Sequence, residues 1–321
     1  MNCRKPRVSV VIPNYNYGRF LRKRLRTVLD QTYGQFEIIY LDDCSTDDSN
    51  EIIAEFADDP RIRRVYNEIN SGSPFIQINK GVRLAHGEFI WVAEADDYAN
   101  SRFLATLLPI LINNPKVGVA YCQSMAVDAN ETALFSMQKH TDYLDEERWT
   151  RDFIAHGQSE CRDYLLHSNT IPNFSAVLFR RSVFESAGFA EESMRLCGDW
   201  LTWVKMLMIS DVAFVAEPLN FYRWHSGTVR RTVSYVNIVK ERYQMLDYLG
   251  RHPEISDSEL DIVRGKVMKE WSHRIRRRKW RDSIWDIPAV IRIAADADPR
   301  FARRFGRLVV DRVRFGLTGS P

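Results

Sequence analysis

Three acidic residues follow a short apolar run, and their spacing suggests a cation site. Residues 88–93 read EFIWVA, and Glu94, Asp96 and Asp97 come directly after this run. Because alternate residues of a strand share a face, Glu94 and Asp96 can point to one spot if the strand continues. Two carboxylates at one spot favour a hard divalent ion such as Mg²⁺ or Mn²⁺, which completes its shell with water and substrate phosphate. We therefore expect Asp96 to bind a metal ion that is shared with a nucleoside diphosphate.

Asp97 has a simpler interpretation than its two neighbours. It precedes residues 101–111, SRFLATLLPIL, which have the pattern of a helix. An acidic residue ahead of a helix commonly caps the first turn. We expect Asp97 to be such a cap.

Alternating strands and helices must position these acids. Short runs rich in β-branched and aromatic residues predict strands at residues 8–12, 36–41, 62–66, 88–93 and 117–122. A helix is expected between the first two strands, at residues 19–32, because Leu21, Leu25, Val28 and Leu29 share a face. This alternation predicts an α/β fold with a mostly parallel central sheet and helices on both faces.

Two further polar clusters also follow predicted strands. Asn14 to Asn16 come after the first strand, and Asp42 and Asp43 come after the second. Ligands of parallel sheets bind beyond the carboxyl ends of the strands, so the three clusters should converge on one edge. The chain has neither a G-x-x-x-x-G-K-[ST] loop nor a G-x-G pair. Any bound phosphates must therefore be held by metal and side chains.

The charge of the chain is concentrated at its C-terminal end. The net charge is +3, yet residues 270–321 contain 13 Lys and Arg against 6 Asp and Glu. We expect a nucleotide-binding and catalytic domain at residues 1–235 and a basic, aromatic-rich helical extension at residues 236–321. The basic segment fits either a solvated helical face or a helix pair that contacts a membrane surface or docks a partner. No nucleic-acid motif accompanies it, so nucleic acid is not an expected partner.

Other sequence features favour a cytoplasmic protein. The longest apolar runs are far shorter than the roughly 20 residues that span a bilayer. The N-terminal residues make a poor signal peptide, and the five cysteines are scattered without C-x-x-C spacing. We expect cytoplasmic residence, with peripheral contact at the inner face of the plasma membrane through residues 270–321.

Four segments, in this order, resemble the signatures of family 2 glycosyltransferases, whose catalytic domain has the GT-A fold. They are VSVVIPNYNYGRFLRKRLRTVLDQTY, FEIIYLDDCSTDDS, NEINSGSPFIQINKGVRLAHGEFIWVAEADD and CGDWLTW, within residues 7–225. The resemblance implies that Pro13, Asn14, Tyr15 and Asp43 surround the nucleoside, and that the segment beginning at Asn70 packs along the nucleotide.

The same resemblance assigns the acids and exposes two departures. Asp96 becomes the metal ligand, and Glu94 takes the place of the first Asp of a D-x-D motif, near the ribose. Glu adds one methylene, which alters that contact. Cys44 stands where the family usually has Gly. Cys would be strained there if the position needs a positive φ, so we expect the turn to have adapted.

Transfer of a sugar with inversion requires a general base for the acceptor hydroxyl. Asp199 matches the Asp of the family's E-D motif, with Gly198 in place of Glu. As an acid in the first turn of a predicted helix, residues 199–208, Asp199 also suits a capping role. Arg223 and His225 resemble a Y-R-x-H segment that faces the diphosphate or metal in the family, whereas a lone His is commonly structural.

Two functions of different classes remain. The first is an inverting, Mg²⁺- or Mn²⁺-dependent glycosyltransferase of hexosyltransferase type. It would move a single sugar from a UDP, GDP or dTDP donor to a glycan or lipid-linked acceptor in surface polysaccharide synthesis. The second is a non-catalytic, sugar-nucleotide-binding scaffold of the same fold, which the departures at Glu94 and Cys44 would favour. A nucleotidyltransferase is disfavoured because the first strand leads into PNYNYGRF, which is not a glycine-rich loop.

Overall fold

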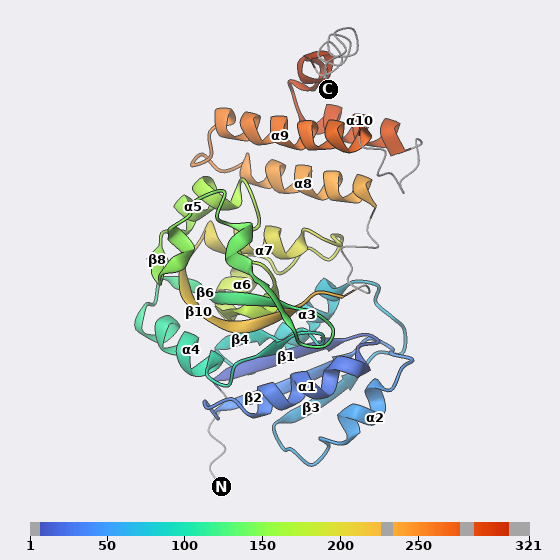
Figure 1. Ribbon diagram of the computed structural model, residues 1–321, viewed down its shortest axis with the longest axis vertical. Helices are drawn as coiled ribbons and strands as arrows, with labels where there is room; N and C mark the ends of the chain where they lie inside the picture. Colours follow the sequence, from blue (N-terminus) through green and yellow to red (C-terminus); the bar gives the residue numbers. More distant parts are fainter. Residues whose placement is uncertain (1–6, 226–233, 277–285, 308–321) are drawn as a thin grey trace. The chain divides into compact units, whose positions relative to one another are not determined.

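A computed structural model describes residues 7–225, 234–276 and 286–307 (Figure 1). The chain divides into two compact units, Met1–Thr228 and Val229–Pro321. The first unit holds the sheet and every residue that the sequence assigns to the site. The second is helical.

The first unit contains a single sheet, whose strands alternate with helices along the chain. Its strands are β1 (Val8–Asn14), β2 (Phe36–Asp42), β3 (Ile62–Tyr66), β4 (Phe89–Val92), β5 (Tyr98–Ala99), β6 (Val117–Val127), β7 (Ala133–Ser136), β8 (Phe153–Ala155), β9 (Val177–Arg180) and β10 (Asp211–Arg223). Its α-helices are α1 (Gly18–Leu29), α2 (Ser49–Ala54), α3 (Pro74–Leu84), α4 (Phe103–Asn113), α5 (Gly157–Glu160), α6 (Arg181–Ser186) and α7 (Gly198–Leu207). Shorter 3₁₀ or π turns cover Met137–His140, Arg148–Thr150, Cys161–Leu165 and Phe174–Ala176.

The strand order is β3-β2-β1-β4-β9-β6-β10-β5, with β7 beside β6 and β8 beside β10. Strands β1 to β4 pair in parallel, and β10 pairs in parallel with β6. Strand β9 runs antiparallel between β4 and β6. The predicted α/β class with a mostly parallel sheet is confirmed, and the five predicted strands are all present.

The chain reverses its direction of travel across the sheet at β1. Strands β2 and β3 are added on one side of β1, and β4 lies on the other side. Because parallel crossovers are right-handed, α1 and α2 cover one face of the sheet and α3 covers the opposite face (Figure 1). The loops that follow β1, β2 and β4 therefore meet at one edge, where parallel sheets bind ligands.

Helix α1 shows why these residues fold as they do. Its buried stripe contains Leu21, Leu25 and Val28, as the spacing predicts, and all three are fully buried. Arg24 lies on the same stripe and is also fully buried. A buried cation on an apolar stripe requires polar partners inside the protein.

The second unit contains α8 (Tyr235–Leu249), α9 (Asp257–Arg276) and α10 (Asp286–Ala297). Its core is formed by side chains that include Val239, Leu246, Val263, Val267 and Ala294. In the described part of the chain, no helix has the length and apolar character needed to cross a bilayer.

Candidate active site

The Asp43 carboxylate organises the loop that follows β3. Asp43 is 5% exposed, and its Oδ1 accepts hydrogen bonds from Asn67 Nδ2 at 2.7 Å, the Ser71 N–H at 2.8 Å and Gln77 Nε2 at 2.9 Å. Asn70 donates from Nδ2 to the Asp43 carbonyl at 2.9 Å. Asp43 and Asn70 are thus brought together, as the resemblance implies, and the structure gives both a role in shaping the loop.

The end of β1 presents one buried and one exposed side chain. Asn14 is 2% exposed and donates from Nδ2 to Asp42 Oδ2 at 3.0 Å and to Ser45 Oγ at 3.1 Å, so it ties β1 to the loop after β2. Tyr15, by contrast, is 46% exposed. Pro13 is paired with Leu41 in the β1–β2 register. Of this group, Tyr15 offers the ring that a bound nucleoside could reach.

Cys44 keeps the backbone conformation that favours glycine. Its φ is +66°, and its Sγ lies 3.4 Å from the carbonyl oxygen of Glu68. The expectation that the turn had adapted is therefore wrong, because the left-handed conformation is retained with a side chain present. Such a conformation costs a non-glycine residue about 1–2 kcal/mol, which the network around Asp43 offsets.

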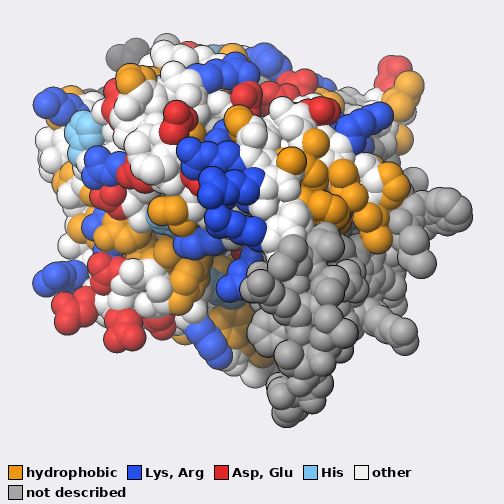
Figure 2. All heavy atoms as spheres, turned by 90° about the horizontal axis from the view of Figure 1, so that it is seen from above, with side chains coloured by type: hydrophobic (Ala, Val, Ile, Leu, Met, Phe, Trp, Pro, Cys, Tyr) orange, Lys and Arg blue, Asp and Glu red, His pale blue; other side chains and the backbone are white. Residues whose placement is uncertain are grey.

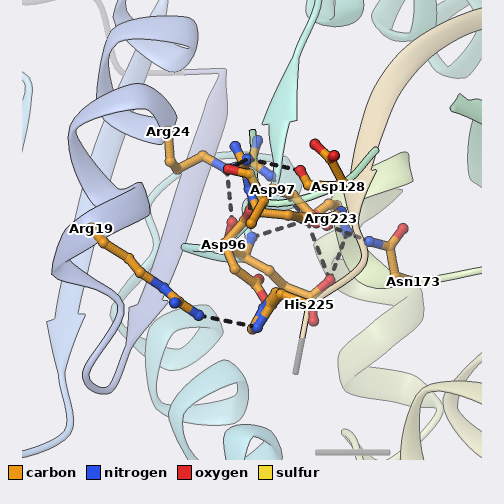
Figure 3. Close-up of polar contacts among 11 residues, drawn as sticks. Arg19, Arg24, Asp96, Asp97, Asp128, Asn173, Arg223 and His225 are labelled. Atoms are coloured by element: carbon orange, nitrogen blue, oxygen red, sulfur yellow. Dashed lines mark hydrogen bonds and ion pairs between the residues drawn. The ribbon is translucent and has the colours of Figure 1, made fainter. Parts of the chain in front are cut away.

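The interpretation of Asp97 as a helix cap is also wrong. Helix α4 begins at Phe103, and the residue in the capping position is Arg102. Asp97 is 1% exposed and lies inside the protein. Its Oδ1 accepts from the Arg223 N–H at 2.8 Å and its Oδ2 from Asn173 Nδ2 at 2.5 Å (Figure 3). Asp97 therefore joins residues 94–97, here called the acidic loop, to β10 and to the segment before β9.

Glu94 is held by the same segment before β9. Its Oε2 accepts from the Ser175 N–H and from Ser175 Oγ, both at 3.3 Å. Arg24 donates from Nε to the Glu94 carbonyl at 2.8 Å and from Nη2 to Ser175 Oγ at 3.1 Å. The buried cation of α1 thus finds its partners beneath the acidic loop.

Asp96 and His225 are brought into contact from distant parts of the chain. Asp96 Oδ2 lies 3.1 Å from His225 Nε2, and Arg19 Nη2 lies 3.3 Å from His225 Nδ1 (Figure 3). A guanidinium can only donate, so Nδ1 is the acceptor and Nε2 carries the proton that points to Asp96. His225 is 5% exposed, and its ring packs against Phe20.

Arg223 is more deeply buried than its expected contact with a diphosphate would require. It is 2% exposed and donates from Nε to the Asp96 carbonyl at 2.7 Å and from Nη1 to the Ala129 carbonyl at 3.1 Å. The guanidinium also lies 3.6 Å from Glu131 Oε1. Arg223 thus supports the backbone of the acidic loop through the Asp96 carbonyl (Figure 3).

The site holds more negative charge than its buried cations neutralise. Burial, followed by the charges of Asp97 and Asp96, raises the pKa of Glu94 well above its usual range. Burial and the charge of Asp96 raise the pKa of Asp97 to about 7. Burial lowers the pKa of Arg24 to about 10 although three acids are nearby. An added cation would reverse the repulsion that raises the carboxyl pKa values.

The donor atoms present fit a cation that takes most of its shell from other sources. Within the described ranges, no three His, Cys, Asp or Glu side chains form a group that could hold a metal ion. Two adjacent ligand atoms of an octahedral ion at about 2.1 Å lie about 3 Å apart, which matches the separation of Asp96 Oδ2 and His225 Nε2. Mg²⁺ and Mn²⁺ commonly use one or two protein ligands plus water and phosphate. Ligation by His225 requires its other tautomer, and thus a shift of Arg19.

Asp199 lies at the start of α7, in contact with a residue that sequence reasoning missed. Its Oδ2 accepts from Asn169 Nδ2 at 3.2 Å, and its Oδ1 accepts from the Trp200 N–H at 2.7 Å. Asp199 is an acid of the first turn of α7 but not its cap, because the residue in the capping position is Cys197. The charge of Asp199 also raises the pKa of Glu94, after burial and the charges of Asp97 and Asp96.

The space beside Gly198 explains the absence of the Glu that the family motif carries there. A Cβ on Gly198 would lie 2.4 Å from Cε2 of Phe75 in α3. Phe75 is 5% exposed and also packs against Phe174. The aromatic ring thus fills the volume that a side chain at position 198 would need.

Gly198→Ala is expected to lower the free energy of unfolding by about 1–3 kcal/mol, because the new methyl group overpacks the site against Phe75. Phe75→Leu in the same chain should recover part of this loss, a coupling that a double-mutant cycle of thermal or denaturant unfolding measures. Gly34→Ala is the matched control, since no atom lies within 4 Å of its Cβ position. Equal destabilisation by Gly198→Ala with and without Phe75→Leu would contradict the packing argument.

The sequence did not predict the three residues that donate hydrogen bonds to the acids, which are Asn169, Asn173 and Ser175. Nothing in their spacing marks them, because each contact spans 30 residues or more. Arg24 did carry a signal. A basic residue at the i+3 position of an apolar stripe needs a buried partner, and the partner here is the acidic loop.

Comparisons with known proteins agree with the fold and the order of motifs. A model of glycosyl transferase family 2 matches residues 9–188. Glycosyltransferase GlyG of Streptococcus pneumoniae is 28% identical over 229 residues, covering 70% of this chain and 73% of the relative. The crystal structure of Staphylococcus aureus TarS 1-349 in complex with UDP-GlcNAc has a TM-score of 0.69 at 15% identity and covers 93% of this chain and 81% of its own.

A second solved structure shares the fold over nearly the whole chain. Mannosyltransferase PcManGT from Pyrobaculum calidifontis, in complex with GDP-Man and Mn²⁺, has a TM-score of 0.60 at 15% identity and covers 99% of this chain and 89% of its own. The sheet order and the acids at its carboxyl edge define a GT-A type α/β protein. With the family model matched over more than half of its length, the chain belongs to glycosyl transferase family 2, and the resemblance in the sequence is confirmed.

Proposed function

We propose that this glycosyltransferase moves a single hexose-type sugar, with inversion, from a nucleoside diphosphate donor to a hydroxyl of a glycan or lipid-linked acceptor. The observation that carries the proposal is the convergence of two sets of acids on one edge. Asp199 and Glu94 both accept hydrogen bonds from residues 169–175, and Asp96 lies in the same loop as Glu94 beside His225. One set suits a general base, and the other suits a cation that neutralises a diphosphate.

The residues of the chain divide the work of binding. Tyr15 and the loop held by Asp43 receive the nucleoside, and Glu94 lies toward the ribose. Asp96, with His225 in its other tautomer, would hold Mg²⁺ or Mn²⁺. A bound ion of this kind neutralises the charge that develops on the departing diphosphate. Arg223 is proposed as a positioning residue of the acidic loop in place of the direct donor contact that the sequence suggests.

Asp199 performs the proton transfer in this proposal. The acceptor hydroxyl would approach the sugar from the face opposite the diphosphate, and a carboxylate oxygen of Asp199 would take its proton as the new bond forms. The Asp199 carboxylate is oriented by two donors, because Oδ2 accepts from Asn169 Nδ2 and Oδ1 accepts from the Trp200 N–H.

The related proteins support the choice of donor and metal. TarS was solved with UDP-GlcNAc, and PcManGT with GDP-Man and Mn²⁺. A UDP, GDP or dTDP sugar and Mn²⁺ or Mg²⁺ are therefore the donor and cofactor proposed for this chain. A role in surface polysaccharide synthesis fits the description of TuaG of Bacillus subtilis as a putative teichuronic acid biosynthesis glycosyltransferase.

Thermal unfolding in the presence of UDP-GlcNAc, GDP-mannose and a dTDP sugar, each with and without Mn²⁺, tests the proposal. One donor is expected to raise Tm only when Mn²⁺ is also present, because the acids at the site repel a diphosphate that lacks its cation. At a donor concentration of about 100 times Kd the stabilisation should be about 2.7 kcal/mol. Mn²⁺ alone and each nucleotide alone are the controls. Equal shifts with and without Mn²⁺ would contradict the metal assignment.

Membrane contact through residues 270–321 and cytoplasmic residence stay predictions. Residues 277–285 and 308–321, which carry much of the basic charge, lie outside the described residues. The described part of this segment includes the exposed side chains Arg292, Arg300, Arg303 and Arg307. Figure 2 shows one face of the molecule with Lys and Arg side chains interspersed with acidic and apolar ones. Exposed arginines such as the four named suit an anionic lipid headgroup.

A further inference from the structure

Residues 169–175, NTIPNFS, contact three of the acids at the site. Asn169 donates to Asp199, Asn173 donates to Asp97, and Ser175 donates to Glu94. The contacts with Asp97 and Glu94 support the acidic loop. The contact with Asp199 is different, because Asp199 is the only one of the three on α7. Asn169 thus links the base to the segment that carries the other supports.

The two ends of the Asn169 amide have unequal surroundings. Nδ2 lies 3.2 Å from Asp199 Oδ2, whereas Oδ1 is buried and has no hydrogen-bond partner among the described residues. Rotating the amide by half a turn would place Oδ1 against the Asp199 carboxylate, and two acceptors repel each other. The carboxylate therefore fixes which way the amide points, and Oδ1 is left needing a donor.

A small cavity next to Asn169 can supply that donor. Its volume is about 20 Å³, and its lining includes Asn169, Thr170, Gln123 and Thr141. Thr170 is 4% exposed, and within the described part of the chain its Oγ1 has no hydrogen-bond partner either. A volume above roughly 10–15 Å³ admits one water, provided that it meets two to four polar groups. The volume meets the first condition, and two of the lining residues, Asn169 and Thr170, each have a buried oxygen without a partner among the described residues.

We propose that Asn169 is a positioning residue for Asp199, and that one water in this cavity holds its amide in place. The inference rests on the proposed function, in which Asp199 is the general base. The water donates to Asn169 Oδ1 and bonds Thr170 Oγ1, so the amide is held at both ends. Asn169 Nδ2 then restricts rotation of the Asp199 carboxylate, which keeps the carboxylate directed at the acceptor hydroxyl. General bases act over about 2.6–3.2 Å, so loss of this restriction costs turnover.

Substitutions of Asn169 separate this role from simple packing. With the donor that raises Tm, and water as the acceptor, the release of nucleoside diphosphate gives kcat and KM. Asn169→Ala should lower kcat about tenfold with KM nearly unchanged, because only the orientation of the base is lost. The Asp side chain has nearly the same size as that of Asn, yet Asn169→Asp should lower kcat about 100-fold. Its carboxyl group either repels Asp199 or shares a proton with it, and both outcomes disable the base.

Two further variants complete the series. Thr170→Val removes one partner of the water at constant volume and should lower kcat about threefold, less than Asn169→Ala. Asn114→Asp is the matched control, since Asn114 lies at the end of α4 and donates to the Ile110 carbonyl, away from the acids. It should leave kcat unchanged. If Asn169→Asp retains as much activity as Asn169→Ala, or if both keep the full kcat, the inference is wrong.

Comparison with Asp199→Asn distinguishes this inference from the proposed function. Asn169→Ala should have no further effect in an Asp199→Asn background, because Asn169 acts through Asp199. If Asp199→Asn keeps its turnover, the proposed base is wrong. If Asp199→Asn is inactive while Asn169→Ala is fully active, only the inference fails.

Crystal structures provide a readout that does not depend on activity. The wild type should show one water bonded to Asn169 and Thr170 in the cavity. Asn169→Ala should show the Asp199 carboxylate rotated or in two conformers. An empty cavity, or an unmoved carboxylate in Asn169→Ala, would overturn the proposal.

Discussion

Asp199→Asn is expected to lower kcat for sugar transfer about 1,000-fold and to leave donor affinity within about twofold of the wild type. Asn has nearly the shape of Asp but cannot take a proton from the acceptor hydroxyl, and a general base contributes roughly 10² to 10⁴ to the rate. Donor binding does not use this proton transfer, so the affinity should persist. Release of nucleoside diphosphate and calorimetric titration with the donor measure the two quantities.

Asp58→Asn is the control for this change, since Asp58 is exposed and lies outside the site. It should leave kcat unchanged. An Asp199→Asn enzyme that keeps more than a tenth of the wild-type kcat would show that another group is the base. If the wild type turns over no sugar nucleotide at all while still binding one, the non-catalytic scaffold becomes the better interpretation.

Asp96→Asn is expected to remove the dependence of donor binding on Mn²⁺. The amide oxygen of Asn is neutral, so the substitution removes a charged ligand from a site with few protein ligands. If donor affinity falls about 100-fold, a donor concentration that stabilised the wild type by about 2.7 kcal/mol would stabilise the variant by only about 0.4 kcal/mol. Thermal unfolding with donor, with and without Mn²⁺, gives this difference.

His225→Gln tests the second ligand in the same experiment. In the present geometry Nε2 carries a proton that points to Asp96. We therefore expect a smaller loss of affinity, about tenfold, because the ion would keep its charged ligand. A donor shift that remains fully dependent on Mn²⁺ in Asp96→Asn would mean that the ion binds elsewhere.

The spacing of apolar residues predicted the strands and helices, because each kind of element buries residues at a regular period. Leu21, Leu25 and Val28 lie on the buried stripe of α1, and Trp200, Val204 and Leu207 are buried on α7, as their periods require. The contact between Asn14 and Asp42 followed from the rule that parallel strands present their carboxyl ends together.

The supports of the acids could not be predicted, because they join residues far apart in the chain. Asp97 resembled a cap when only its neighbours in sequence were considered. Its partners Asn173 and Arg223 lie 76 and 126 residues further along. The prediction for the turn at Cys44 was wrong for another reason. The strain of a positive φ is local, but the network that offsets it, through Asp43 and Asn67, is formed by a different loop.

The packing of Phe75 against Gly198 constrains how this enzyme can diverge. A larger side chain at position 198 requires a smaller one at position 75, so we expect the two positions to covary. Relatives that carry Glu at the position of Gly198 should carry a smaller or differently placed side chain at the position of Phe75. A designer who wishes to install that Glu beside the base would have to alter α3 first, and only then the start of α7.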